Sequence, residues 1–169
     1  MVTETPSAVA VKVADAVWAA TALLHRDFPQ AADFALQEIV NRVQSETHLG
    51  THKRQTLYAH VTQHCVANVS PNTGKYRMLF ETVKGRRRLF KAGDPSDLNR
   101  AGKIIPQPDG LPREFQPLVE WYRAVYSVPQ SLAQRLKNDP ILAMRGLGKE
   151  IWAGVDADEY VRQLREDWE

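Results

Sequence analysis

Positive side chains are concentrated in the middle of this 169-residue chain. Residues 51–103 contain eleven Lys and Arg but only three Asp and Glu, a local charge of +8, although the whole chain carries only +2. The segments on either side each sum to −3. A concentrated positive field most often attracts a nucleic-acid backbone, so the chemistry expected here is phosphate binding. The alternative is a basic face that contacts only solvent.

No group of side chains in the sequence predicts catalysis. His60 and His64 lie one helical turn apart, but zinc sites need three or four ligands and no further pair is evident. Cys65 falls on an apolar helix face, where a thiol is more often part of the core than a nucleophile. Gly146-x-Gly148-Lys149 lacks the spacing of a phosphate-binding loop. We therefore predict no enzyme, no catalytic residue, no metal and no cofactor.

The composition indicates a cytoplasmic protein. A single Cys excludes an internal disulfide framework, which suits a reducing compartment. Residues 8–24 are apolar but are interrupted by Lys12 and Asp15, and nothing else approaches the roughly 18 apolar residues that span a bilayer. With 43% apolar residues, we expect one ordinary domain, or a small domain with an appended segment, and no membrane partner.

Three helices are predicted ahead of the most basic stretch. The first covers residues 8–26 and carries one apolar stripe at spacings of three and four. Asp33 is expected to cap the second helix, which ends near Glu46, and Thr51 to cap the third. In the third helix Leu57, Val61 and Cys65 are expected to face inward.

A β-hairpin is predicted after the third helix, because residues 76–82 and 86–91 flank the turn Val83-Lys84-Gly85. Three helices followed by a basic hairpin predict an α+β, mainly α fold, a winged helix-turn-helix domain at residues 8–103, rather than a plain three-helix bundle.

We expect this domain to bind double-stranded DNA, with the third helix in the major groove and the hairpin on the backbone or in the minor groove. Neutralising about five phosphates would give a log–log salt slope near −4 to −5. The side chains predicted to contact DNA are Lys53, Arg54, Gln55, Tyr58, Thr62, Lys84, Arg86, Arg87 and Arg88.

Three further segments are predicted after the hairpin. Residues 104–112 are expected to be a Pro-rich linker. Residues 113–127 are expected to form a helix that either docks on the first domain or makes a homodimer seam, with Val125 on its inward face. Residues 128–169 read as an extended apolar tail broken by Pro and Gly, which lies either on another protein or on its own N-terminal domain.

The tail resembles a known pattern. Residues 141–152, Ile-Leu-Ala-Met-Arg-Gly-Leu-Gly-Lys-Glu-Ile-Trp, followed by residues 156–168, resemble the C-terminal toxin-binding tail of VapB-type bacterial antitoxins. The resemblance implies that apolar anchors enter the groove of a PIN-domain ribonuclease toxin and that Arg145 or Lys149 meets its acidic metal site. With the stripe of the terminal helix, the predicted partner-binding residues are Leu142, Arg145, Leu147, Lys149, Ile151, Trp152, Tyr160, Leu164 and Trp168.

Residues 10–126 resemble a separate, poorly characterised bacterial winged-helix domain. The matching elements are Trp18-Ala-Ala, Glu38-Ile-Val, His64-Cys-Val-Ala-Asn, Tyr76-Arg-Met-Leu, Arg88-Leu-Phe, Gly93-Asp-Pro and Leu111-Pro to Trp121-Tyr122. VapB antitoxins usually bind DNA through a swapped-hairpin barrel or a ribbon-helix-helix, so a winged helix departs from that pattern. Together the resemblances imply a DNA-binding antitoxin of a toxin-antitoxin system that regulates its own transcription. The alternative is a winged-helix module of a defence, repair or transcription system.

Overall fold

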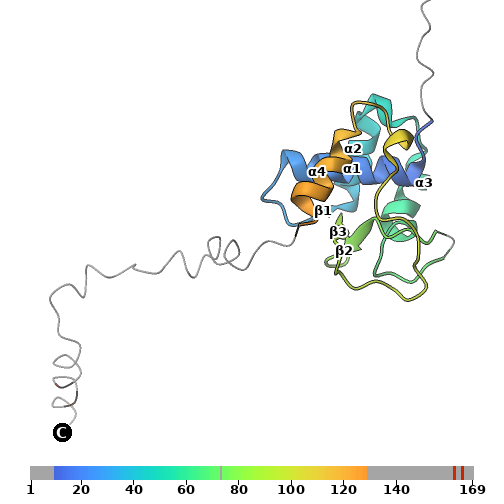
Figure 1. Ribbon diagram of the computed structural model, residues 1–169. Helices are drawn as coiled ribbons and strands as arrows, with labels where there is room; N and C mark the ends of the chain where they lie inside the picture. Colours follow the sequence, from blue (N-terminus) through green and yellow to red (C-terminus); the bar gives the residue numbers. More distant parts are fainter. Residues whose placement is uncertain (1–9, 73, 129–161, 163–164, 166–169) are drawn as a thin grey trace, which may run out of the picture. The chain divides into compact units, whose positions relative to one another are not determined.

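The computed structural model describes residues 10–72 and 74–128, together with Arg162 and Arg165. The chain divides into two compact units, Met1–Val128 and Pro129–Glu169. The described part of the first unit is α+β and mainly helical, with four α-helices and a small antiparallel sheet (Figure 1). Its elements in chain order are α1 (Val13–Asp27), β1 (Phe34–Ala35), α2 (Leu36–Ser45), η1 (Thr47–Leu49), α3 (Arg54–Ala59), η2 (His60–His64), β2 (Leu79–Glu81), β3 (Arg86–Leu89), η3 (Pro108–Gly110), α4 (Pro117–Trp121) and η4 (Tyr122–Tyr126).

Helix α1 is the central element of this unit. Every residue from Ala14 to His25 is buried. The prediction of a single buried stripe was wrong, because α2, β3 and α4 all pack against this helix. A helix that is covered on all sides must be largely apolar, and the many Ala residues around Trp18 meet that requirement. Its three buried polar side chains, Asp15, Thr21 and His25, each have a hydrogen-bond partner.

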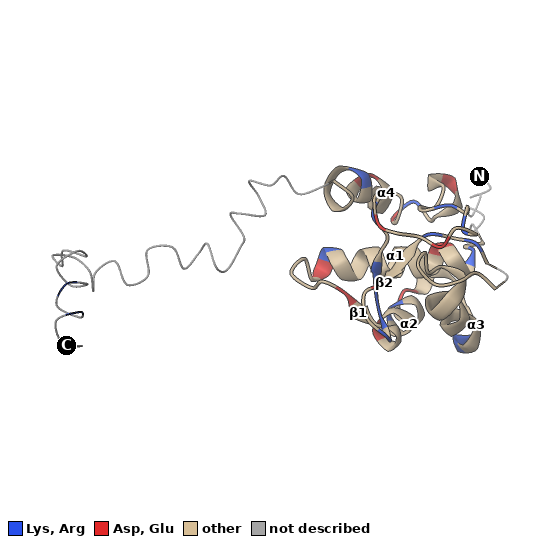
Figure 2. Ribbon diagram, turned by 90° about the horizontal axis from the view of Figure 1, so that it is seen from below, with Lys and Arg blue, Asp and Glu red and all other residues tan. Residues whose placement is uncertain are grey.

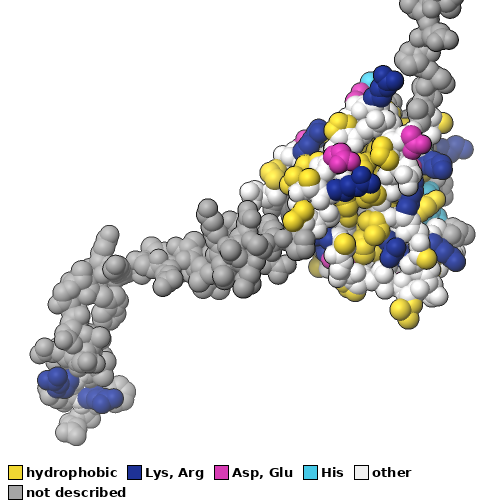
Figure 3. Space-filling model, viewed as in Figure 1, with side chains coloured by type: hydrophobic (Ala, Val, Ile, Leu, Met, Phe, Trp, Pro, Cys, Tyr) yellow, Lys and Arg dark blue, Asp and Glu magenta, His cyan; other side chains and the backbone are white. Residues whose placement is uncertain are grey.

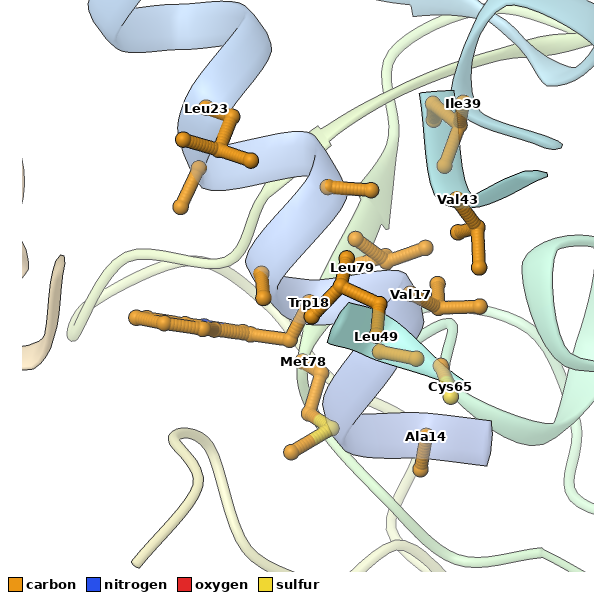
Figure 4. Packing of buried hydrophobic residues seen from close by; sticks show 14 of the residues in the cluster. Ala14, Val17, Trp18, Leu23, Ile39, Val43, Leu49, Cys65, Met78 and Leu79 are labelled. Carbon is orange, nitrogen blue, oxygen red and sulfur yellow. The ribbon is translucent and has the colours of Figure 1, made fainter. Parts of the chain in front are cut away.

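The core is built around α1, as the close view in Figure 4 shows. Trp18 is fully buried, and its ring meets the Tyr122 ring edge to face with 5.7 Å between centroids. Leu49, Met78 and Leu79 reach the same core from η1 and from the hairpin. Burying each aliphatic side chain of this size contributes roughly 1.5–3 kcal/mol, so the core holds the hairpin and the helices in one unit.

The start of α2 differs from the prediction. Asp33 does not cap the helix, because the Glu38 carboxylate accepts the N–H of Ala35 at 2.6 Å, while Asp33 binds side chains of the hairpin instead. The two residues before α2 form β1, which is too short to have a periodicity that the sequence could display.

The third helix consists of α3 continued by a π-helical turn, η2. Its first helical residue is Arg54, and no side chain caps it, so the prediction that Thr51 caps this helix was wrong. Leu57, Val61 and Cys65 are fully buried, as predicted from their spacing of four.

Strands β2 and β3 form the predicted hairpin, shorter than expected at both ends. They pair antiparallel, with Leu79 opposite Leu89 and Glu81 opposite Arg87. β1 pairs with the other edge of β3, so the strand order is β1-β3-β2. The hairpin is therefore tied to the segment that leads into α2.

Residues 104–112 do not form the predicted linker. Leu111 is fully buried, and Ile104 and Ile105 pack against the core. Proline prevents regular hydrogen bonding, but it does not prevent apolar neighbours from being buried. This segment belongs to the first compact unit.

The helix predicted at residues 113–127 begins at Pro117 and docks on its own unit. Leu118, Val119 and Tyr122 are buried, and Tyr122 donates a hydrogen bond to the carbonyl oxygen of Phe90. Val125, predicted to face inward, is 63% exposed. It lies in the π-helical turn η4, whose wider turn changes which residues share a face with α4.

Candidate nucleic-acid interface

Amide side chains line the exposed side of α2. Gln37, Asn41 and Gln44 follow one another at spacings of four and three, which places them on one helix face. The Nε2 of Gln37 donates to the Oδ1 of Asn41 at 2.7 Å. The sequence-based prediction missed these residues, although their spacing is visible in the sequence.

Two side chains of α3 bind this row of amides. The Arg54 guanidinium donates to the Oε1 of Gln44 and, at 3.1 Å, to the Oδ1 of Asn41. The Tyr58 hydroxyl donates to the Oε1 of Gln37. Helices α2 and α3 therefore share one polar surface, which we call the α2–α3 surface and which consists of Gln37, Asn41, Gln44, Arg54 and Tyr58.

The other predicted DNA-binding residues of the third helix lie beside this surface in sequence. Lys53 and Gln55 are exposed at the start of α3. Thr62 is half-buried, and its Oγ1 donates to the carbonyl oxygen of Tyr58 at 2.7 Å. Its hydroxyl is thus already engaged by the helix backbone.

The turn of the hairpin lies against the start of α2. The Leu36 N–H donates to the carbonyl oxygen of Gly85 at 3.3 Å. Gly85 has φ +83°, a left-handed conformation that glycine adopts without strain. Lys84 and Val83 are exposed at this turn.

Hydrogen bonds form a continuous path from α3 through α2 to the hairpin turn. Tyr58 binds Gln37, and Leu36, the next residue back along the chain, binds Gly85. Lys84 and Arg86 lie on either side of Gly85. They are therefore close to Gln37, which is in the first turn of α2 and marks one end of the α2–α3 surface. Figure 2 shows basic positions at α3 and also along the hairpin strand β3, near α2.

Arg87 does not lie on this surface. It is only 3% exposed, and its guanidinium donates to the carbonyl oxygens of Val61 and Thr62 at 3.1 and 3.4 Å and pairs with Glu81. Its predicted role in DNA binding is corrected: Arg87 satisfies carbonyl groups near the C-terminal end of the third helix, which would otherwise lack donors. Burial lowers the pKa of Arg87.

Arg88 has an internal partner as well. Its Nη1 and Nη2 donate to the two carboxylate oxygens of Asp94 at 2.6 and 2.8 Å, and its guanidinium lies 4.5 Å from the centre of the Phe80 ring. The hydrogen bond with Asp94 raises the pKa of Arg88. Because this charge is compensated by a bidentate pair, Arg88 adds little to the attraction of phosphate.

Arg100, one of the eleven basic residues of segment 51–103, is also buried. Its guanidinium donates to five carbonyl oxygens, and two of these, on Gln63 and His64, are at the end of η2. The other three belong to the connector between η2 and the hairpin, on Val69, Gly74 and Tyr76. Nothing in the local sequence distinguishes this arginine from an exposed one.

Acidic side chains lie beside the hairpin turn, where Lys84 and Arg86 adjoin the α2–α3 surface. Asp33 pairs with Arg86, and the charge of Glu38 also acts on Arg86. Acidic and basic positions lie close together around β1, β2 and α2 in Figure 2. Among the described residues of α3 and the hairpin turn, three exposed basic side chains are not part of an ion pair: Lys53, Arg54 and Lys84.

The histidine pair and the cysteine are accounted for by the fold. The His60 and His64 rings lie edge to face with 4.9 Å between centroids, and the His60 Nδ1 contacts the carbonyl oxygen of Thr56 at 2.9 Å. Burial raises the pKa of the Cys65 thiol. Within residues 10–72 and 74–128, no three His, Cys, Asp or Glu side chains come together as metal ligands.

The surface over α4 has a different character. The space-filling view in Figure 3 shows hydrophobic side chains there interspersed with charged ones. Phe28, Val125 and Val128 are each about half exposed or more, at 56%, 63% and 49%.

The predicted partner-binding residues, from Leu142 to Trp168, lie outside the described residues. Among the described helices, the longest has 15 residues, and none has the length and apolar character needed to cross a membrane. Comparisons with protein-family models, curated proteins and solved structures found no match to this chain.

Proposed function

We propose that the first unit is a winged-helix domain that binds double-stranded DNA through the α2–α3 surface and the turn of the hairpin. In this proposal α3 enters the major groove and residues 82–86 form the wing. The element order α1-β1-α2-α3-β2-β3 and the strand order β1-β3-β2 support it.

The observation that carries the proposal is the joining of α3 to the hairpin turn through α2. Arg54 and Tyr58 bind amides of α2, and Leu36 binds Gly85 of the turn. The amide oxygens of Gln37, Asn41 and Gln44 accept hydrogen bonds within the surface, which leaves amide N–H groups to donate to base edges. Exposed Lys and Arg bind phosphates, so the surface carries both kinds of group that DNA recognition needs.

The number of phosphates expected is smaller than the sequence indicated. Arg87 and Arg88 have internal partners, and Arg86 is paired with Asp33. Lys53, Arg54 and Lys84 then remain for the backbone, which gives an expected log–log salt slope of about −3 instead of −4 to −5.

A binding titration tests the proposal. The full-length protein is titrated into a labelled duplex of arbitrary sequence at several salt concentrations, and fluorescence anisotropy is followed. The variant with Lys53, Arg54 and Lys84 changed to Ala should lose nearly the whole salt slope. The control variant changes Lys12, Arg113 and Arg123 to Ala, removing the same charge from exposed positions outside α2, α3 and the hairpin. Equal losses in both variants, or no salt-dependent binding by the unmodified protein, would contradict the proposal.

We further propose, on the sequence resemblance, that residues 128–169 bind a PIN-domain toxin. The division of the chain after Val128 into a second unit supports a separate role for this part. Co-expression of the full chain with the PIN protein of a neighbouring gene should yield a stable complex, and a chain ending at Val128 should not. If both chains behave alike, the alternative of a DNA-binding module without a toxin partner is favoured.

A further inference from the structure

Asp33 joins the segment before α2 to both ends of the hairpin turn. Its Oδ2 accepts a hydrogen bond from the Thr82 hydroxyl at 2.5 Å, and its Oδ1 accepts one from the Nε of Arg86. The Nη2 of Arg86 also donates to the main-chain oxygen of Asp33 at 3.0 Å. Three hydrogen bonds therefore meet at one residue that lies about fifty positions away in the sequence.

This contact places a negative charge on the basic end of the candidate interface. The Arg86 side chain is 45% exposed, whereas that of Asp33 is 17% exposed. The hydrogen bonds from Thr82 and Arg86 lower the pKa of Asp33, so its carboxylate is ionised at neutral pH. Glu38 lies near enough for its charge to act on Arg86 as well.

We propose that Asp33 limits the affinity of this surface for any nucleic-acid backbone by holding Arg86 in an ion pair. The inference rests on the proposed DNA binding and adds a specificity-determining residue to it. A guanidinium that is already paired with a carboxylate releases few counterions when it approaches a phosphate, so it adds little to non-specific binding. Lower non-specific affinity raises the ratio between specific and non-specific sites.

The geometry explains why a carboxylate is used for this purpose. Arg86 precedes the buried Arg87 and lies beside the hairpin turn. An unpaired guanidinium at this position could bind any phosphate near Lys84. Asp33 also fixes the turn, because it binds Thr82 at one end and Arg86 at the other. An Asn in its place keeps the shape and one acceptor oxygen but removes the charge.

The experiment compares the full-length protein with Asp33→Asn on a duplex of arbitrary sequence over a series of salt concentrations. Asp33→Asn should bind several-fold more tightly at low salt, and its log–log slope should be steeper by about 0.9, the value for one additional phosphate. The double variant Asp33→Asn/Arg86→Ala should return to the slope of the unmodified protein. A role in folding alone would change the melting temperature without steepening the slope.

Glu120→Gln is the matched control. Glu120 also pairs with an arginine, Arg123 at 3.1 Å, but it lies on α4. Removing its charge frees one arginine and changes the net charge by the same amount, and the salt slope should not change. A steeper slope in this variant would show that net charge alone is responsible and would overturn the inference.

A second measurement does not depend on the folding of Asp33→Asn. If Arg86 is held by Asp33, Arg86→Ala alone should leave the salt slope unchanged, while Arg54→Ala should reduce its magnitude by about 0.9. Equal reductions in the two variants would overturn the inference but leave the proposed DNA binding intact. If the unmodified protein shows no salt-dependent binding, the proposed DNA binding and the inference about Asp33 are both wrong.

Discussion

The Nε of Arg87 lies 3.1 Å from the carbonyl oxygen of Val61, so a hairpin arginine reaches the backbone of the third helix. The helix beyond Val61 has no further turn to satisfy its last carbonyl groups, and a guanidinium supplies several donors in a fixed arrangement. The hairpin and the third helix are therefore joined by a charged side chain inside the fold, while the neighbouring Arg86 is exposed.

Arg87→Ala is expected to destabilise the protein. It leaves buried carbonyl groups and the Glu81 carboxylate without their donor, which costs about 2–4 kcal/mol in the free energy of unfolding. Urea unfolding followed by circular dichroism measures the change. Arg86→Ala, in the adjacent exposed position, is the control and should reduce the free energy of unfolding much less than Arg87→Ala does. An Arg87→Ala protein of unchanged stability that binds DNA weakly would restore the original prediction for this residue.

Arg100→Lys is expected to be nearly as harmful, although the charge is kept. A lysine has three donors on a single nitrogen and cannot reach five carbonyl oxygens spread over residues 63–76, so we expect a loss of about 2–3 kcal/mol in unfolding free energy. The same urea titration measures it. Lys75→Arg, an exposed change in the same connector, serves as the comparison. Full stability of Arg100→Lys would show that charge alone is sufficient at this position.

Gln55→Ala is expected to change sequence preference more than overall affinity. Gln55 is exposed at the start of α3, which in the proposed DNA complex is the recognition helix whose first residues meet base edges. Loss of one bidentate base contact costs about 1–3 kcal/mol on the preferred sequence only. Selection from a pool of randomised duplexes, followed by titration on the selected sequence, measures both effects. Lys53→Ala should instead weaken binding to all sequences alike, and identical behaviour of the two variants would argue against base reading by Gln55.

His25 is expected to make the protein less stable in mild acid. Burial first, then the charges of Lys91 and Arg88, lower its pKa to about 4 from an ordinary 6.5. The unfolded chain therefore binds a proton at His25 more readily than the folded chain does. The free energy of unfolding is unaffected by His25 above pH 6.5 and decreases as the pH falls toward 4, by up to about 3 kcal/mol.

Urea unfolding at a series of pH values tests this. His25→Gln should lose less stability than the unmodified protein over the same range, because Gln does not titrate there. The exposed His48→Gln, which removes a surface contact with Glu114, provides the comparison for loss of a histidine outside the core. If the unmodified protein and His25→Gln follow parallel curves, His25 is not the group responsible.

The local patterns determined much of the described fold. The spacing of apolar residues predicted the first three helices, and the Gly-containing turn predicted the hairpin of β2 and β3. These features depend on neighbours within one or two turns of the chain, which a single sequence displays directly. The capping residues Asp33 and Thr51 were predicted wrongly, because a polar side chain ahead of a helix can equally well bind a distant partner.

Only the tertiary structure decided which arginines face solvent. Arg86, Arg87 and Arg88 are identical in type, and the two residues that follow, Leu89 and Phe90, are both apolar, so the sequence does not show which alternate positions of the strand face the core. Pairing with β1, a strand of two residues, and with β2 turned Arg87 and Leu89 inward and left Arg86 outside. Arg100 was decided in the same way, because its carbonyl partners come together only once the chain has folded. A sequence records where charge is present, whereas the partners that neutralise it are fixed by contacts between distant segments.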